Sequence, residues 1–149
     1  MPDPSRQRRW SAQARTTDTF GRVLCNTRDQ HFVVDGPVQN GCPGEAVTPG
    51  ELFLTSIAAC GVELIEVFAR QDEVPLRAVH VEISGELDLD DPVRSDFTVF
   101  RTVELDVSLG GVTREQAEHL VERFQGRCPL YGSMAVATPD VTVSVTAEP

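Results

Sequence analysis

The hydrophobic pattern of the chain is strongest between residues 49 and 71, where apolar positions recur on nearly every side of a helical projection. Thr48 can cap such a helix, Pro49 suits its first position, and Glu51 completes a capping box with Thr48. We predict that the helix ends at about Gln71. Its apolar positions are Leu52, Phe53, Leu54, Ile57, Ala58, Ala59, Val62, Leu64, Ile65, Val67 and Phe68. A helix with this pattern is buried on more than one side. A chain this short has little to cover the second side, so we predict a homodimer.

Two runs of alternating apolar and polar residues follow this helix, which is the pattern of half-buried strands. They cover residues 79–84 and 97–107, with a polar turn at 88–92 between them. This arrangement predicts a long antiparallel hairpin with one face in water. Arg101 interrupts the apolar face of the second run. We interpret it as the exposed end of that strand rather than as an inward-facing charge.

Two or three shorter strand-like pieces precede the long helix, around residues 10–15, 22–25 and 31–34. A loop rich in glycine and proline then runs from Asp35 to Thr48. These features predict a small set of strands, followed by an irregular loop that leads to the start of the helix.

A second helix is predicted after the hairpin, with Thr113 and Gln116 as another capping box and Gly126 as its end. A last strand alternates over residues 141–146. The order is strands, buried helix, hairpin, helix, strand. Since no crossover helix joins the two long strands, this order predicts an α+β fold in a single domain, residues 1–149, with an antiparallel sheet packed on the buried helix.

Composition and charge narrow the class of protein. The formal net charge is −10, and all 13 basic residues are arginine, so the chain lacks the cationic face that nucleic-acid binding needs. Its start is too short and polar for a signal peptide, and no run approaches the length of a membrane span. We therefore expect a cytoplasmic protein without a membrane partner, whose four cysteines are reduced, catalytic or metal-bound.

Two of the cysteines are candidates for chemistry. Cys60 lies about 18 Å along its helix from the N-terminal end, too far for the helix dipole to ionise it. Burial raises the pKa of such a thiol, so a reactive Cys60 needs an arginine or a charged histidine, and otherwise it is a small core residue. Cys128 follows a helix end beside Arg127. Exposure there would favour disulfide exchange, whereas a partly buried loop thiol is the alternative.

Other potential sites are weaker. A zinc site could in principle be built from Cys25, Cys42, Cys60, Cys128 and His31. The C-x₂₋₄-C spacing that marks such sites is not present in the sequence, so we predict no metal and no cofactor. The sequence does not assign Cys25 or Cys42 a role.

Glu51 has two interpretations. It is either the partner of Thr48 in the capping box or a carboxylate that holds an arginine near the thiol. Nine residues separate it from Cys60, which puts the two on opposite sides of the helix and about 14 Å apart along its axis. We favour the cap.

Taken together, the two cysteine motifs resemble those of the OsmC/Ohr superfamily, the osmotically inducible and organic-hydroperoxide-resistance proteins. The motifs are TPGELFLTSIAAC, ending at Cys60, and RCPL around Cys128. The resemblance extends over nearly the whole chain, to the element order and to Trp10 in the first strand. The glutamate of the hydroperoxide-reductase branch would fall at Gly50, one place before Glu51, so this chain is more similar to the wider OsmC-like branch.

The resemblance implies an intertwined α+β homodimer with its buried helices at the centre and its active sites at the subunit interface. It also implies a peroxidase for hydrophobic organic hydroperoxides. Cys60 would form a sulfenic acid, Cys128 would condense with it to a disulfide, and an external dithiol would reset the pair, with a lipoyl-bearing protein as one candidate.

In the reductase branch, an arginine from the first strands ionises the thiol and a glutamate holds that arginine. Arg15 fits this role best and Arg22 second, with Glu51 as the candidate glutamate. The rival interpretation is a non-catalytic OsmC-like domain that binds a small apolar or thiol-reactive ligand at the dimer interface. A short distance between the two sulfur atoms would favour redox chemistry.

Overall fold

The computed structural model describes residues 6–149, which group into two compact units. The N-terminal unit ends at Leu52, and the C-terminal unit is Phe53–Pro149. The long helix α1 (Pro49–Gln71) is continuous across this boundary. Each unit is described on its own below.

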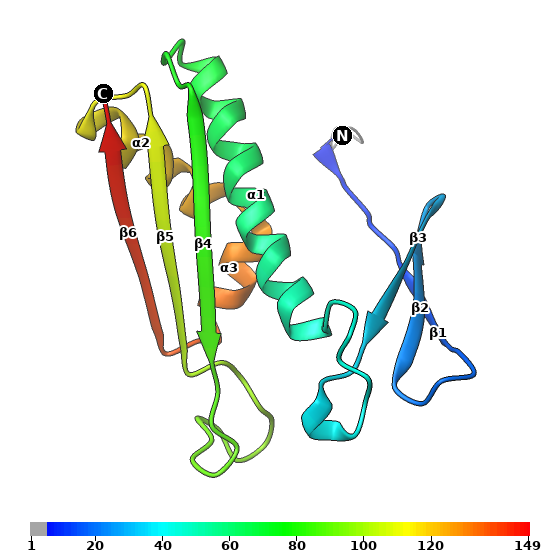
Figure 1. Cartoon of the computed structure of the whole chain (residues 1–149). Coiled ribbons are helices and arrows are strands. Elements are labelled where there is room, and N and C mark those ends of the chain that lie inside the picture. Colours follow the sequence, from blue (N-terminus) through cyan, green and yellow to red (C-terminus); the bar gives the residue numbers. More distant parts are fainter. Residues whose placement is uncertain (1–5) are drawn as a thin grey trace. The chain divides into compact units, whose positions relative to one another are not determined.

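The N-terminal unit is a three-stranded antiparallel sheet in the order β1-β2-β3 (Figure 1). Its strands are β1 (Gln13–Thr16), β2 (Arg22–Thr27) and β3 (Gln30–Asp35). All three predicted strand segments are confirmed. Trp10 lies outside β1, so the expectation that it belongs to the first strand was wrong. A short 3-10 turn, η2 (Val38–Asn40), follows in the Gly- and Pro-rich loop.

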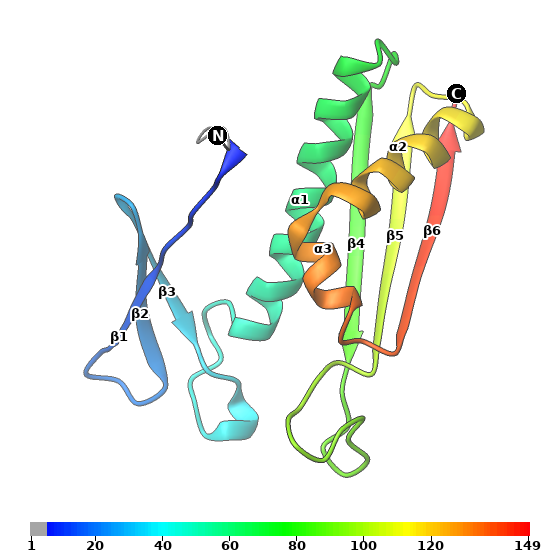
Figure 2. The ribbon, with the colours of Figure 1, turned by 180° about the vertical axis from the view of Figure 1, so that it is seen from behind.

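The C-terminal unit is a three-stranded sheet, in the order β4-β5-β6, with helices on one face (Figure 2). Besides most of α1, its elements are β4 (Ala78–Glu86), β5 (Thr102–Gly110), α2 (Arg114–Arg127), α3 (Pro129–Ala135) and β6 (Asp140–Glu148). β4 and β5 are antiparallel, as predicted, but β5 and β6 are parallel. The expected antiparallel sheet is therefore a mixed one. The reason is that α2 and α3 act as the crossover that a parallel pair requires.

Both predicted capping boxes form. The Thr48 N–H donates to Glu51 Oε2 at 2.8 Å, and the Glu51 N–H donates to Thr48 Oγ1 at 3.4 Å. Thr113 and Gln116 make the same reciprocal pair at the start of α2. Gly126 does not end α2, however, because the helix continues to Arg127 and Cys128 is its C-cap.

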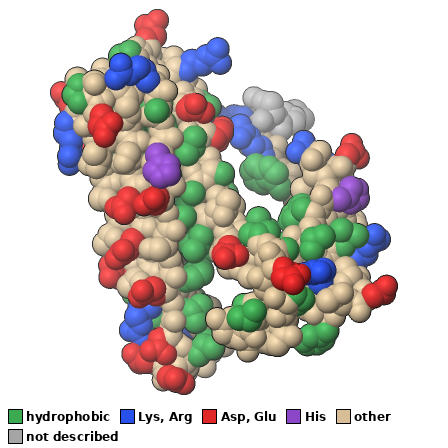
Figure 3. Space-filling view, in the orientation of Figure 1, with side chains coloured by type: hydrophobic (Ala, Val, Ile, Leu, Met, Phe, Trp, Pro, Cys, Tyr) green, Lys and Arg blue, Asp and Glu red, His purple; other side chains and the backbone are tan. Residues whose placement is uncertain are grey.

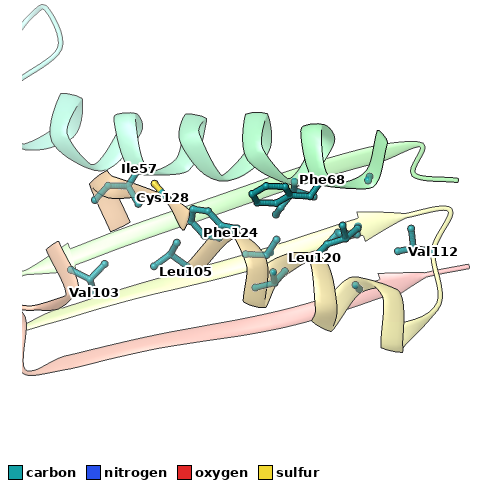
Figure 4. Close-up of a cluster of buried hydrophobic side chains, with 14 of the residues drawn as sticks. Ile57, Phe68, Val103, Leu105, Val112, Leu120, Phe124 and Cys128 are labelled. Carbon is teal, nitrogen blue, oxygen red and sulfur yellow. The ribbon is translucent and has the colours of Figure 1, made fainter. Parts of the chain in front are cut away.

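The core of the C-terminal unit lies between the helices and the sheet (Figure 4). α1 contributes Ile57, Ile65 and Phe68, and α2 contributes Leu120 and Phe124, all buried. The inward side chains of β5 are Val103, Leu105, Val107 and Leu109, none more than 1% exposed. Since burial of apolar area is the main stabilising contribution, this layer fixes α1 against β5.

The other face of the sheet is polar, as the alternation predicts (Figure 3). Its exposed side chains include Glu82, Glu104 and Asp106. Arg101 lies just before β5, where its side chain pairs with Asp91 in solvent. The interpretation of Arg101 as the exposed end of the strand is confirmed.

By length and composition, α1 could cross a membrane. It has 23 residues and a mean hydropathy of 1.9 over its most apolar 18-residue window. The expectation that no run reaches this length was wrong. Core helices of globular domains meet the same criterion, and the buried residues of α1 belong to the core described above.

Candidate active site

The two predicted cysteines converge in the C-terminal unit. The Cys128 thiol donates a hydrogen bond to the Cys60 sulfur, with the two Sγ atoms 2.8 Å apart. Both residues are free thiols, since a disulfide bond would bring the sulfur atoms to about 2.05 Å. Cys60 comes from the middle of α1 and Cys128 from the junction of α2 and α3. Residues 68 positions apart in the sequence are thus poised for reaction with each other.

The backbone on both sides holds Cys128 in place. Its N–H donates to the Phe124 carbonyl at 2.9 Å and so closes α2. Its sulfur accepts the Tyr131 N–H at 3.3 Å and caps α3, which has Pro129 in its first turn. The sequence left open whether Cys128 is an exposed thiol or a partly buried loop thiol, and the residue is only 3% exposed. The exposed alternative is wrong, because α3 starts immediately after the cysteine and leaves no loop.

Two aromatic side chains, Phe124 and Tyr131, belong to the same core cluster as the thiol pair. Gly61, next to Cys60, is buried, and a Cβ there would lie 3.3 Å from Cζ of Phe124. Phe124 in turn packs against the Tyr131 ring with the centroids 5.5 Å apart. Gln125 donates to the Tyr131 hydroxyl at 2.9 Å. The sequence did not predict this packing of Phe124 against Tyr131, which depends on α3. The available signal for α3 was Pro129, because proline is common at the first position of a helix.

The environment of Cys60 disfavours its ionisation. The pKa of this thiol is raised to about 12; burial is the largest cause, the hydrogen bond with Cys128 is the second, and electrostatic repulsion from Cys128 and Glu63 contributes the rest. This agrees with the prediction that burial makes Cys60 unreactive by default. Peroxide chemistry at neutral pH therefore requires a cation that acts on Cys60.

Arg15 and Glu51 belong to the N-terminal unit, whereas both thiols belong to the C-terminal unit. Arg15 is exposed in β1, opposite Leu24. The Glu51 carboxylate accepts from the Thr48 N–H and hydroxyl, and these hydrogen bonds lower its pKa. Among residues 6–149, Arg15 and Glu51 form no ion pair with each other. The capping interpretation of Glu51 is thus supported, whereas the roles of Arg15 and Glu51 toward Cys60 stay predictions.

Arg22, the second candidate arginine, is bound within its own unit. Its Nε and Nη2 donate to the two oxygens of the Asp35 carboxylate at 2.8 and 2.9 Å. Nη2 also reaches Glu45 at 2.8 Å. Asp35 is fully buried, and this guanidinium together with backbone N–H groups holds its pKa well below the usual range. Sequence reasoning missed Asp35, which it took only as the start of a loop.

The two remaining cysteines both lie in the N-terminal unit, one in a strand and one in a loop. Cys25 lies in β2, opposite Ala14 and Phe32. Cys42 covers Gly21 and Gly36, where a Cβ would come within 2.4 Å of its sulfur. Within residues 6–149, no three His, Cys, Asp or Glu side chains gather as metal ligands would.

Comparison with known proteins gives one family and several solved structures. The family described as OsmC-like protein matches residues 42–144, whereas no curated protein matches the chain. An OsmC-like protein from Mycoplasma pneumoniae aligns with a TM-score of 0.82 at 13% identity, covering 95% of this chain and 99% of that one.

Two further solved structures have names that mention peroxides. An organic hydroperoxide resistance protein OsmC from Legionella pneumophila aligns with a TM-score of 0.70 at 23% identity, covering 95% and 98% of the two chains. A putative organic hydroperoxide resistance protein from Vibrio cholerae, with captopril bound in one of its active sites, gives 0.66 at 20% identity, covering 93% and 94%. At these identities the similarity shows the α+β fold alone.

Proposed function

Because the chain belongs to the OsmC-like protein family, we propose that it is a thiol-dependent peroxidase that reduces organic hydroperoxides to alcohols. The observation that carries this proposal is the 2.8 Å separation of the Cys60 and Cys128 sulfur atoms. Thiols this close can exchange between dithiol and disulfide with little movement. The names of the Legionella and Vibrio proteins of the same fold support the substrate class.

The reaction has three steps. The Cys60 thiolate attacks the terminal peroxide oxygen, an S–O bond forms as the O–O bond breaks, and the alkoxide takes a proton to leave as the alcohol. Cys60 is then a sulfenic acid. The Cys128 sulfur attacks the Cys60 sulfur and expels the hydroxyl as water, which yields the disulfide. An external dithiol reduces this disulfide by two thiol exchanges and is itself oxidised to a disulfide.

The first step needs a cation, because burial and the neighbouring Cys128 and Glu63 together raise the pKa of Cys60 to about 12. We keep Arg15 as the proposed source of that charge and Glu51 as its proposed partner. Arg15 is exposed in β1, so contact with a thiolate would not cost it an existing ion pair among residues 6–149. The proposal thus assigns ionisation of the thiol to an arginine outside the core that holds the thiols.

A homodimer is part of the same proposal. α1 buries one side against the sheet, yet Phe53 and Val67 on this helix remain 42% and 37% exposed. Exposed large apolar side chains on a core helix are typical of a surface that a second subunit covers. We propose that the dimer works in the cytoplasm, where reduced dithiols regenerate the pair, and that an external dithiol, such as a lipoyl group on a carrier protein, is its reductant.

The test is consumption of cumene hydroperoxide with dithiothreitol as reductant. We expect the wild type to consume the peroxide and Cys60→Ser to abolish the reaction. Cys25→Ser is the matched control, since Cys25 lies in β2 outside the pair, and it should retain the activity. A wild type that consumes no hydroperoxide would refute the proposal.

The raised pKa of Cys60 favours one other function, a non-catalytic domain that binds a small apolar or thiol-reactive ligand. Intact-mass measurement after stoichiometric peroxide separates the two. A loss of two hydrogen atoms indicates the disulfide and supports the peroxidase. An unchanged mass, together with no peroxide consumption, supports the binding domain.

A further inference from the structure

A buried carboxylate outside the thiol site organises the segment that leads into α1. Asp35, at the end of β3, is fully buried. Besides its paired bonds from Arg22, its Oδ2 accepts the N–H groups of Glu45 and Ala46 at 3.0 and 2.8 Å. One carboxylate therefore joins strand β2 to the loop that precedes the helix.

These contacts continue to the first turn of α1. The Asp35 N–H donates to the Val47 carbonyl at 3.1 Å. The next residue, Thr48, is the N-cap of α1, and its carbonyl accepts the Leu52 N–H at 2.9 Å. Thr48 also binds the Glu51 carboxylate. Asp35 is thus linked to Glu51 within the N-terminal unit by a hydrogen bond to Val47, the peptide bond from Val47 to Thr48, and the hydrogen bonds from Thr48 to Glu51.

The loop that precedes α1 is held at a second point, by the side chain of Cys42. The Cys42 side chain covers Gly21 and Gly36, and a Cβ on either glycine would lie 2.4 Å from its sulfur. The Gly36 N–H donates to the Gly21 carbonyl at 2.8 Å. This glycine pair therefore lies at the end of the β2–β3 ladder. The loop is therefore held both at this glycine pair and at Asp35, which leaves it little freedom.

Moving Arg22 away from Asp35 would lower the stability of the N-terminal unit. Its guanidinium fork matches the carboxylate in a bidentate pair. Removing one partner of a buried ion pair leaves an uncompensated charge and is strongly destabilising. An arginine that must ionise a thiol elsewhere would have to give up Asp35.

We propose that Arg22 and Asp35, together called the loop clamp, are positioning residues that fix the start of α1 and the Glu51 carboxylate, and that Arg22 is not the arginine that ionises Cys60. The effect on catalysis rests on the proposed peroxidase function. The effect on the loop does not, because it follows from hydrogen bonds made within residues 22–52.

The test compares Arg22→Met, Arg22→Lys and Asp35→Asn, with Glu45→Gln as the matched control because its side chain makes only the exposed contact to Arg22. Rates are measured well below each variant's melting temperature, so a role in stability alone would leave kcat/KM unchanged. We expect Arg22→Met and Asp35→Asn to lower kcat/KM by about tenfold, since small misplacements near a site cost up to about 100-fold. Arg22→Lys should restore part of the loss, and Glu45→Gln should stay within about twofold.

Two measurements do not need peroxidase activity. Hydrogen exchange of the Glu45 and Ala46 amides should accelerate in Asp35→Asn and in either Arg22 variant, and unchanged exchange would overturn the loop clamp. The pH dependence of Cys60 alkylation should change to the same extent in Arg22→Met and in Asp35→Asn, because both act through the position of Glu51. A shift to higher pH in Arg22→Met that Asp35→Asn does not reproduce would make Arg22 the ionising arginine and overturn the proposal. If the wild type consumes no hydroperoxide, the proposed function fails while these two readouts still decide on the loop clamp.

Discussion

Replacing Arg15 with methionine tests how Cys60 becomes reactive, and the raised pKa of Cys60 allows the size of the effect to be worked out. Burial and Cys128 raise the pKa of Cys60 from its ordinary 9.0 to about 12. At pH 7.5, such a thiol is ionised in only ~0.003% of molecules, whereas an ordinary one is ionised in ~3%. The proposed arginine has to supply most of this difference.

A guanidinium about 4 Å from the sulfur contributes about 4 kcal/mol at an effective dielectric constant of about 20. This energy corresponds to a factor of about 1,000 in ionisation, which returns the thiol to about its ordinary behaviour. The more basic thiolate of the variant is also the stronger nucleophile, by about 20-fold for a Brønsted exponent of about 0.4–0.5. The net loss expected for Arg15→Met at neutral pH is therefore about 50-fold.

The assay is iodoacetamide alkylation of Cys60, followed by peptide mass spectrometry between about pH 6 and pH 10. Arg15→Met should lower the rate at neutral pH and shift the profile to higher pH. Arg9→Met removes the same charge from an exposed position outside β1 and serves as the control. Superimposable profiles for Arg15→Met and the wild type would refute the assignment of Arg15.

Three further outcomes follow from the contacts of the C-terminal unit. Cys128→Ser removes causes that raise the pKa of Cys60, so Cys60 should alkylate faster, and peroxide should leave it as sulfenic or sulfinic acid; a disulfide in the intact mass would contradict this. Phe124→Ala, at a fully buried position, should lower the free energy of unfolding by about 3–5 kcal/mol in urea titration, and a loss below about 1 kcal/mol would contradict the core described here. Arg123 lowers the pKa of Asp72, so this pair stabilises the fold above the unfolded pKa and the gain disappears as pH falls through the lower folded value. The melting temperature of Asp72→Asn should therefore fall less on acidification than that of the wild type, and parallel curves would contradict the pairing.

The features that the sequence predicted well are local ones. Thr48 with Glu51 and Thr113 with Gln116 are capping boxes because side chains bond to backbone groups three residues away. Alternation over β4 and β5 reflects the inward and outward sides of one sheet. Such patterns need no knowledge of distant parts of the chain, and the structure reproduces them.

The features that the sequence did not predict depend on contacts across the fold. Alternation in β6 says which side chains point inward but not whether the strand is parallel to β5. α3 has seven residues, too few to show a helical period. Glycine commonly ends a helix, so Gly126 predicts the end of α2 too early; the helix continues to Arg127 and its C-cap is Cys128. The burial of Cys128 and the buried pair of Arg22 with Asp35 likewise follow from segments that meet only in the folded chain.

Backbone hydrogen bonds hold Cys128 at the junction of α2 and α3. In the proposed reaction, this fixed position affects which reductants can reopen the disulfide. Because the backbone holds its sulfur 2.8 Å from that of Cys60, each thiol meets the other at a very high effective concentration. A single external thiol that opens the disulfide forms a mixed disulfide, which the neighbouring cysteine promptly reverses. A dithiol escapes this reversal, since its own second thiol competes within the same molecule. In the proposed peroxidase cycle, the geometry that speeds closure of the disulfide would therefore favour two-thiol reductants over monothiols.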